Sequence, residues 1–310
     1  MAESVKFKRA VIVGVGLIGS SLARAFRERG LTEEIVGVDQ DAGVLARAQN
    51  IGVINRGESS LEAGVNGADL IILSTPVGAI ASVVAALAAA ADDGALIIDV
   101  GSVKGVVADA AKSLPDRLYF VPSHPVAGTE QSGPEAGFAS LFQDRWCILT
   151  PLEREDAAYK AAVEKAAALW AGVGAQVEIM DAAHHDLALA VTSHLPHLIA
   201  FTLVGAADDV ESVAAGEVVK YSAGGFRDFT RIAASNPIMW RDVFLSNKDA
   251  VLEVLGRFSE ELAVMQRAIR WGDGKALEDA FARGRSLRRA IVEAGQETAA
   301  PNFGRDDKGH

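Results

Sequence analysis

Residues 10–21 read A-V-I-V-G-V-G-L-I-G-S-S, a short apolar run followed at once by a glycine-rich turn and a helical pattern. The spacing is G-x-G-x-x-G, and the loop consists of Gly14, Gly16, Leu17, Ile18 and Gly19. In this context the first glycine allows a tight turn, the second lets a pyrophosphate approach the backbone, and the third lets the helix pack against the strand. The stretch therefore predicts the start of a dinucleotide-binding domain.

A carboxylate farther along the chain supports this interpretation. Asp39 ends the second apolar run, 20 residues after Gly19, where it can accept both hydroxyl hydrogen bonds of an adenosine ribose. A 2'-phosphate would be repelled there, so NAD is favoured over NADP, although Gln40 and Arg47 leave NADP open. Two alternatives remain: a methyltransferase-like adenosine site, or glycines that serve only the turn.

Short apolar runs alternate with helical patterns up to residue 180, which is typical of a parallel sheet flanked by helices. The expected strands are residues 10–13, 35–38, 70–73, 96–100, 119–122, 147–150 and 176–179, and the expected helices are 20–29, 77–91 and 156–171. Beyond residue 181 only helical periodicity remains, over 182–207, 209–219, 240–272 and 275–294. We expect an α/β fold: a Rossmann-type doubly wound sheet over 1–180 and an all-α substrate and dimerisation domain over 181–310.

Composition narrows the possible partners. The 310 residues are 50% hydrophobic and 23% charged, with a formal net charge of −11, and neither half is basic. Such a chain has no electrostatic footprint for nucleic acid or an anionic membrane. The single cysteine, Cys147, fits a reducing compartment, and we find no secretory signal and no apolar stretch long enough to span a bilayer. We therefore expect a cytoplasmic protein that forms a homodimer through its amphipathic helices.

Polar residues follow several of the expected strands, at the edge where ligands bind in open parallel sheets. Ser74, Thr75 and Pro76 follow the third strand; they could meet a cofactor or simply end a strand and begin a helix. Ser102, in D-V-G-S-V-K, is placed as a helix N-cap. His124 opens S-H-P-V-A-G-T-E-Q-S-G after another strand, which favours a positioned general base over a structural histidine.

The second half supplies candidates for binding an anion. His194 and His197 flank Pro196 and share one face of a kinked helix, but no third ligand stands at a persuasive spacing, so we expect no metal. Packing imidazoles are the alternative. Two arginines, Arg227 and Arg231, follow paired glycines in G-G-F-R-D-F-T-R, which suggests a bend that exposes charge.

At this point the chain resembles the prephenate/arogenate dehydrogenase family of tyrosine biosynthesis. The motifs that carry the resemblance occur in order over residues 10–272: G-V-G-L-I-G-S-S at Gly14, D-V-G-S-V-K at Asp99, S-H-P-V-A-G-T-E at Ser123, S-H-L-P-H at Ser193 and G-G-F-R-D-F-T-R at Gly224. The resemblance implies an oxidative decarboxylation in which a dianionic cyclohexadiene loses hydride to NAD, sheds its ring carboxylate as carbon dioxide and becomes aromatic.

The resemblance also implies roles for single residues. His124 would take the ring hydroxyl proton, and Ser102 would bond near that histidine and the nicotinamide. Arg231 would bind a carboxylate, His197 would donate a hydrogen bond to substrate with His194 close by, and Arg227 would steer substrate or pair with Asp228. The remaining residues implied to line the pocket are Thr129, Glu130 and Trp240, with Glu130 at the entrance and Trp240 reaching toward a neighbouring subunit.

Two other functions are compatible with the pattern. A β-hydroxyacid dehydrogenase also joins a dinucleotide domain to a helical domain, but it needs a catalytic lysine, and neither Lys220 nor Lys248 lies in a recognisable motif. A non-enzymatic NAD-sensing dimer explains the glycine loop but leaves His124 and Arg231 without a role. Nothing in the sequence separates prephenate from arogenate as substrate.

Overall fold

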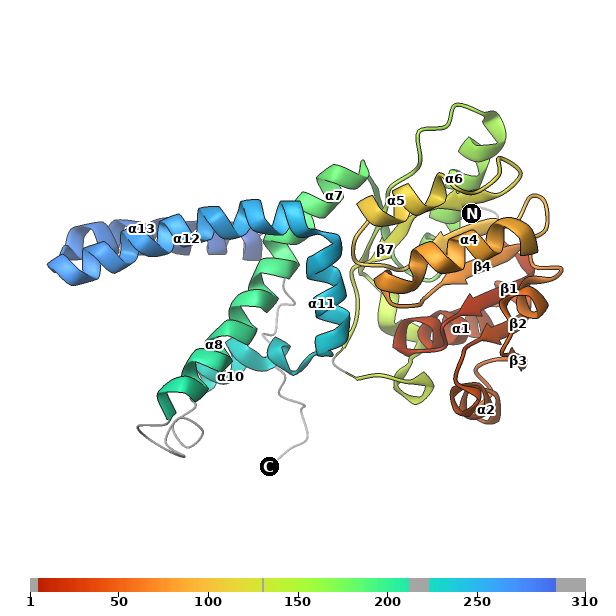
Figure 1. Ribbon diagram of the computed structural model, residues 1–310, viewed down its shortest axis with the longest axis horizontal. Coiled ribbons are helices and arrows are strands. Elements are labelled where there is room, and N and C mark those ends of the chain that lie inside the picture. The colour runs from red at the N-terminus through yellow and green to blue at the C-terminus, as the bar shows by residue number, and fades with distance from the viewer. Residues whose placement is uncertain (1–4, 130, 212–222, 294–310) are drawn as a thin grey trace. The chain divides into compact units, whose positions relative to one another are not determined.

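The structure is a computed structural model that describes residues 5–129, 131–211 and 223–293 (Figure 1). By internal contacts the described chain groups into two compact units. The first consists of the residues up to Leu198 together with Ala234–Val251, and the second consists of Ile199–Ala233 together with the residues from Leu252 onward.

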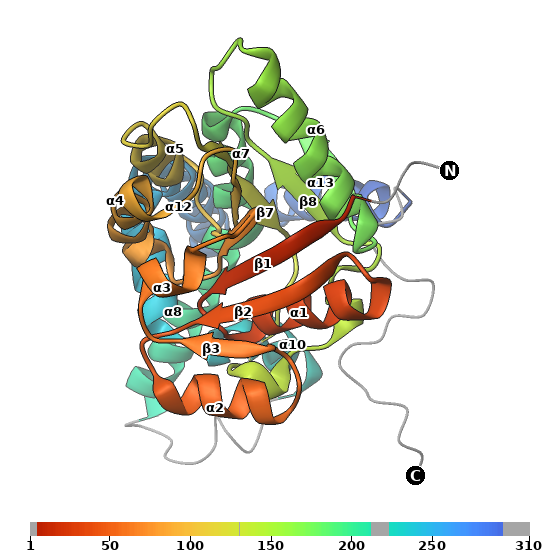
Figure 2. The ribbon, with the colours of Figure 1, turned by 90° about the vertical axis from the view of Figure 1, so that its right-hand side faces the viewer.

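A six-stranded parallel sheet lies at the centre of the first unit, in the order β3-β2-β1-β4-β5-β6 (Figure 2). Its strands are β1 (Phe7–Val13), β2 (Thr32–Val38), β3 (Arg56–Glu58), β4 (Leu70–Leu73), β5 (Leu96–Asp99) and β6 (Tyr119–Val121). The strand order reverses between β1 and β4, where open α/β sheets bind ligands outside the carboxyl ends of their strands. This architecture confirms the expected Rossmann-type fold.

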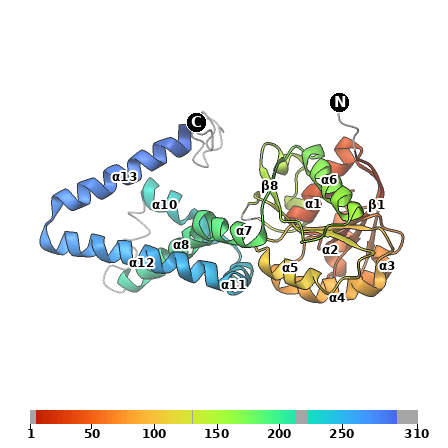
Figure 3. The same ribbon diagram turned by 90° about the horizontal axis from the view of Figure 1, so that it is seen from above.

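Helices cover both faces of this sheet. They are α1 (Leu17–Arg29), α2 (Ala42–Asn50), α3 (Leu61–Val65), the 3₁₀ turn η1 (Val77–Ala79), α4 (Ile80–Ala90), α5 (Gly105–Ala111) and α6 (Ala157–Gly172). Ala10 and Ile12 of β1 share a core with α1 and α6, whereas Val11 and Val13 share a core with α3, α4 and α5. Figure 3 shows α1 and α6 on one side of the sheet and α3, α4 and α5 on the other. Because both faces are buried, the strand has no polar alternation.

A second sheet corrects one expectation. We expected the last two apolar runs to extend the parallel sheet, but they form a separate sheet in the order β7-β8-β9. Its strands are β7 (Ser123–Pro125), β8 (Trp146–Leu149) and β9 (Gln176–Ile179). Pro122 has no N–H and ends the β6 ladder, and its carbonyl instead accepts the N–H of Thr150 at 2.9 Å. The chain then re-pairs, with β7 antiparallel to β8.

The 3₁₀ turns η2 (Pro134–Ala136) and η3 (Ala139–Phe142) precede β8, and from Asp181 onward the described chain is helical. The helical elements are α7 (Ala182–Leu189), the π-helical turn η4 (Ala190–His194), α8 (Leu195–Glu211), α10 (Gly224–Thr230), the 3₁₀ turn η5 (Arg231–Ala234), α11 (Pro237–Ser246), α12 (Lys248–Trp271) and α13 (Gly274–Glu293). Most of the helix expected over 209–219 lies outside the described residues. Gly272, with a φ of 69°, turns the chain from α12 into α13 (Figure 1).

Two further expectations about the helices are wrong. The helix expected over 240–272 is broken at Asn247, which is the C-cap of α11. The side chain of Asn247 is buried there and donates a hydrogen bond to the carbonyl of Asp186. The second is that no apolar stretch is long enough to span a bilayer, because the helical run Ala182–Ala207, with a mean hydropathy of 1.7, has that length and composition. One such helix is weak evidence, since core helices of soluble proteins pass the same test.

A buried ion pair joins the end of β5 to the start of β7. The Lys104 ammonium is wholly buried, pairs with the carboxylate of Asp99, and donates to the carbonyl of Ser123 at 2.7 Å. Asp99 in turn accepts the N–H of Ser123 at 2.9 Å. Burial lowers the pKa of Lys104, and the carboxylate of Asp99 opposes this effect. Isolated buried charges are costly, so each partner needs the other.

The start of α5 corrects the expected role of Ser102 as its cap. The N-cap residue is Lys104, and no side chain within the segment caps the helix. The N–H groups of Lys104 and Gly105 instead donate to the carboxylate of Asp186, from α7. A carboxylate accepts two N–H bonds at once, which a single serine hydroxyl placed two residues earlier cannot do.

We predict that Lys104→Met lowers the free energy of unfolding by about 3–5 kcal/mol, because it leaves the carboxylate of Asp99 buried without its cation. Chemical denaturation measures this loss. Lys112→Met is the matched control, since Lys112 pairs with Asp109 in full solvent just beyond α5 and should change stability little. Equal losses in the two variants would contradict the importance of the buried pair.

Candidate active site

The three glycines of the loop between β1 and α1 differ in what surrounds them. Gly14 has a φ of +92°, and a Cβ there would lie 2.7 Å from the carbonyl oxygen of Ser74. A Cβ on Gly19 would lie 2.4 Å from the carbonyl oxygen of Gly14, whereas one on Gly16 would meet no atom within 4 Å. The first glycine thus serves the turn, the third serves the packing of α1, and Gly16 leaves an open approach to the backbone.

The surroundings of the loop fit a dinucleotide. No side chain caps the N-terminus of α1, so its first N–H groups, which include those of Leu17 and Ile18, can face an anion. Asp39, at the end of β2, accepts the N–H of Val15 at 3.0 Å and lies partly exposed beside the loop. Its position at the carboxyl end of β2 is the one that the sequence pattern predicts for a ribose-binding carboxylate.

The end of β4 contributes to the same loop. The Ser74 hydroxyl donates to the carbonyl of Gly14 at 2.6 Å. The Thr75 hydroxyl oxygen is buried and makes no hydrogen bond to the described residues. Pro76 is exposed and stands as the N-cap of η1, so its place at a helix start is structural. The hydroxyl of Thr75 is a polar group that a bound cofactor could satisfy.

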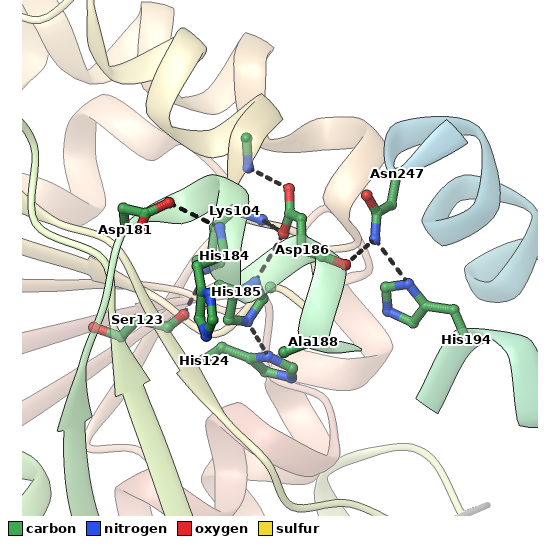
Figure 4. Close-up of polar contacts among 12 residues, drawn as sticks. Lys104, Ser123, His124, Asp181, His184, His185, Asp186, Ala188, His194 and Asn247 are labelled. Atoms are coloured by element: carbon green, nitrogen blue, oxygen red, sulfur yellow. Dashed lines mark hydrogen bonds and ion pairs between the residues drawn. The ribbon is translucent and has the colours of Figure 1, made fainter. Parts of the chain in front are cut away.

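His124 lies in β7, two residues beyond Pro122, and it pairs with Ile148 of β8. Its side chain is buried, and its Nδ1 atom lies 2.8 Å from Nε2 of His185 on α7 (Figure 4). Burial lowers the pKa of His124 well below 6.5, and His185, Lys104 and His194 lower it further. The imidazole is therefore neutral near pH 7 and can accept a proton.

Sequence reasoning missed two residues of this site, His185 and Asp186. His185 Nδ1 lies 2.8 Å from Oδ1 of Asp186, so three side chains form a chain of hydrogen bonds that ends at His124 (Figure 4). The segment D-A-A-H-H-D reads as the polar start of a helix, and Asp181 does cap α7 by accepting the N–H of His184. The signal that could have identified these residues is the pair His185–Asp186, because the cap of α7 is Asp181 and capping therefore gives Asp186 no role.

A second cluster surrounds the π-helical turn η4, just before Pro196. Pro196 has no N–H to donate to a carbonyl of the preceding turn, and the π-helical turn accommodates the missing hydrogen bond. His194 is buried, which lowers its pKa to about 4, and the backbone of Ser102 opposes that effect. The Asn247 amide donates to the Asp186 carbonyl at 2.8 Å and lies 3.0 Å from Nδ1 of His194. Asn247 was not identified from the sequence.

His197 stacks on Trp240, with ring centroids 3.7 Å apart, and its Nδ1 lies 2.9 Å from the Ser193 carbonyl. That carbonyl can only accept, so neutral His197 carries its proton on Nδ1. Trp240 is buried, and its indole N–H makes no hydrogen bond to the described residues. The structure thus brings the two rings together within one chain, and the reach of Trp240 toward a second subunit stays a prediction.

The remaining candidates that the structure describes are all exposed. Thr129 is exposed and accepts the N–H of Gln131 at 3.2 Å, and Glu130 lies outside the described residues. Arg227, on α10, and Arg231, in η5, are exposed and belong to the second compact unit. Lys248 is exposed at the start of α12, and Lys220 lies outside the described residues.

Comparison with known proteins identifies relatives for both halves of the chain. The family model "Prephenate dehydrogenase, nucleotide-binding domain" matches residues 22–179, and "Prephenate dehydrogenase, dimerization domain" matches residues 181–283. A cyclohexadienyl dehydrogenase from Zymomonas mobilis is 41% identical over 92% of this chain and 96% of its own length.

Solved structures give the same result. A prephenate dehydrogenase from Aquifex aeolicus in complex with hydroxyphenyl propionate and NAD+ is 35% identical, with a TM-score of 0.83 over 94% of this chain and all of its own. An arogenate dehydrogenase from Synechocystis is 26% identical, with a TM-score of 0.74 over 91% of this chain and 99% of its own. These similarities extend over both halves of the chain, whereas the glycine loop is a signature of the first half only.

We predict that two alanine substitutions in the glycine loop affect different properties, one the stability of the fold and the other the affinity for NAD. Gly19→Ala should lower the free energy of unfolding by about 1–3 kcal/mol, because its Cβ overlaps the Gly14 carbonyl. Gly16→Ala should leave stability nearly unchanged but weaken NAD binding by about tenfold or more, because the methyl group fills the open approach. Denaturation and calorimetric titration measure the two effects. NAD binding unchanged in Gly16→Ala would place the cofactor elsewhere.

Proposed function

Because the chain belongs to the prephenate dehydrogenase family, we propose that it catalyses the NAD-dependent oxidative decarboxylation of prephenate, arogenate or both. The products are 4-hydroxyphenylpyruvate and tyrosine, respectively, so the reaction belongs to tyrosine biosynthesis. The observation that carries the proposal is His124, a buried neutral imidazole directly after Ser123, whose N–H donates to Asp99 at the carboxyl end of β5.

The chain's own groups have three tasks in this reaction. His124 accepts the proton of the ring hydroxyl, and Ser102, in the turn between β5 and α5, orients groups near that histidine. The glycine loop, Asp39 and Thr75 hold the cofactor, which accepts the hydride when bound. Decarboxylation and aromatisation supply the driving force, so the protein chiefly aligns the reacting carbon and excludes water.

Recognition of the substrate's negative charge is assigned to the helical half. Arg231 binds a carboxylate with its planar fork, and Arg227 and Glu130 adjust the charge at the entrance beside Thr129. His197 contributes a hydrogen bond, with His194 and Trp240 behind it.

We place the boundary between the two functional halves at residue 180, with 1–180 binding NAD and 181–310 binding substrate and a second copy of the chain. The two family models meet between residues 179 and 181. Exposed apolar side chains on α12 and α13 support a homodimer: Leu252, Leu262, Ile269, Trp271, Phe281 and Leu287. The buried free thiol of Cys147 supports a reducing, cytoplasmic location.

We predict that the purified protein, given NAD and prephenate, releases NADH and 4-hydroxyphenylpyruvate, with tyrosine as the product from arogenate. Absorbance at the NADH band and chromatography of the aromatic product measure the two. Turnover should hold from high pH down through pH 6.5 and fall only as the pH drops through the lowered pKa of His124, because the base must be neutral.

His124→Asn should lower kcat by about 10²-fold to 10⁴-fold while NAD affinity stays unchanged. His184→Asn, an exposed neighbour on α7, serves as the control and should retain wild-type turnover. If neither cyclohexadiene is turned over by the wild-type protein, the proposed function is wrong.

A separate prediction concerns the arginine fork. Arg231→Lys should raise KM by about tenfold or more with a smaller effect on kcat, because lysine cannot form the paired hydrogen bonds. Arg267→Lys, on the exposed surface of α12, is the matched control. Steady-state kinetics with both substrates measure the effect, and an unchanged KM would move the carboxylate contact to another residue.

A further inference from the structure

We propose that His185 and Asp186 are positioning residues that fix the tautomer of His124, with the proton on Nδ1 and a bare Nε2 facing the substrate. The inference deepens the proposed function, since it concerns the group that accepts the hydroxyl proton. It rests on the hydrogen-bond chain Asp186–His185–His124, which lies within one compact unit (Figure 4).

The chain of reasoning begins at Asp186, whose carboxylate is held on both oxygens. Oδ1 accepts the N–H of Lys104 at 2.7 Å, and Oδ2 accepts the N–H of Gly105 at 2.8 Å. Because each oxygen faces a backbone N–H donor, both oxygens act as hydrogen-bond acceptors. Its backbone carbonyl is also fixed, by the amide of Asn247. Asp186 is therefore a rigid acceptor.

His185 must adapt to that acceptor. Its Nδ1 atom lies 2.8 Å from Oδ1 of Asp186, so Nδ1 carries the proton and donates it. The ring is wholly buried, and burial lowers its pKa, although its hydrogen bond to Asp186 opposes that shift. A neutral His185 with its proton on Nδ1 has a bare Nε2. This atom can only accept a hydrogen bond, and the atom that faces it is Nδ1 of His124.

The tautomer of His124 follows directly. Its Nδ1 atom lies 2.8 Å from the bare Nε2 of His185, so Nδ1 must carry the proton and donate. The two rings meet edge to face at an angle of 67°, which suits one in-plane donor. Neutral His124 is then left with a bare Nε2. The opposite tautomer would place two lone pairs against each other and could not accept a proton from the substrate.

The same arrangement handles the charge that appears during the reaction. When the O–H bond of the substrate breaks, its proton forms an N–H bond with Nε2 of His124, which becomes an imidazolium. The Nδ1 proton of that ring can shift to Nε2 of His185, and the positive charge then lies against the carboxylate of Asp186. The opposing groups around His124 are the ammonium of Lys104 and the ring of His194, with Asp99 paired to Lys104.

The alternative is that His185 only fills space beneath His124. Two substitutions at this position separate the two roles. His185→Gln keeps an oxygen that can accept the Nδ1 proton of His124, whereas His185→Leu keeps the apolar volume but offers no acceptor. In Asp186→Asn the amide cannot satisfy every donor around it, so the tautomers of both histidines lose their anchor.

The experiment measures both the tautomer and the kinetics in the full-length protein. Selective ¹⁵N-imidazole labelling and NMR of the six histidines should show His124 protonated on Nδ1 in the wild type. His185→Leu and Asp186→Asn should lose this single tautomer and lower kcat by about 10²-fold across the pH range above 6.5, with KM and NAD affinity nearly unchanged. His185→Gln should keep the tautomer and stay within about tenfold of the wild type.

His184→Gln is the matched control on the same helix, and it should change neither spectrum nor rate. A wild-type spectrum with the His124 proton on Nε2 would overturn the inference, even if a variant failed to fold. So would equal activity of His185→Gln and His185→Leu. The spectrum needs no turnover, so its result stands apart from the substrate assays that test the proposed function.

Discussion

The ammonium of Lys104 lies wholly out of solvent between the carboxylate of Asp99 and the carbonyl of Ser123, while its own N–H donates to Asp186. One residue thus joins the end of β5, the start of β7 and the helix α7. Because a buried charge must stay paired, these segments cannot separate without a large loss of free energy. The positions of His124 and His185 depend on this node, since the first follows Ser123 and the second precedes Asp186.

The dinucleotide half could be predicted well because its signals are local. The strands of the central sheet are buried on both faces, so β1, β4 and β5 stand out as apolar runs. Gly14 and Gly19 are required sterically, because a Cβ at either position would clash with the backbone, and Gly16 leaves the approach to the loop open. By contrast, β3 is only three residues long and contains Arg56 and Glu58, and β7 consists of Ser123, His124 and Pro125. Neither segment has the composition of a strand, because pairing partners and not intrinsic preference determine its conformation.

The site was only partly predictable for the same reason. His124, His194 and His197 occur in motifs, but the partners that define their chemistry come from distant segments. His185 and Asp186 follow an N-capped helix start that already has a local explanation, and the break at Asn247 becomes intelligible only with Asp186 and His194 in place. Local propensity describes the structure that a segment prefers alone. The roles of these residues depend instead on hydrogen bonds to residues about 50–80 positions away in the sequence.

The single residue between β6 and β7 limits how this chain can vary in length. Side chains alternate between the two faces of a strand, so the one-residue link at Pro122 determines which way the imidazole of the next strand points. Gaining or losing one residue there would reverse the whole of β7 and turn His124 away from its partner. Insertions and deletions accumulated over evolution should therefore avoid this junction.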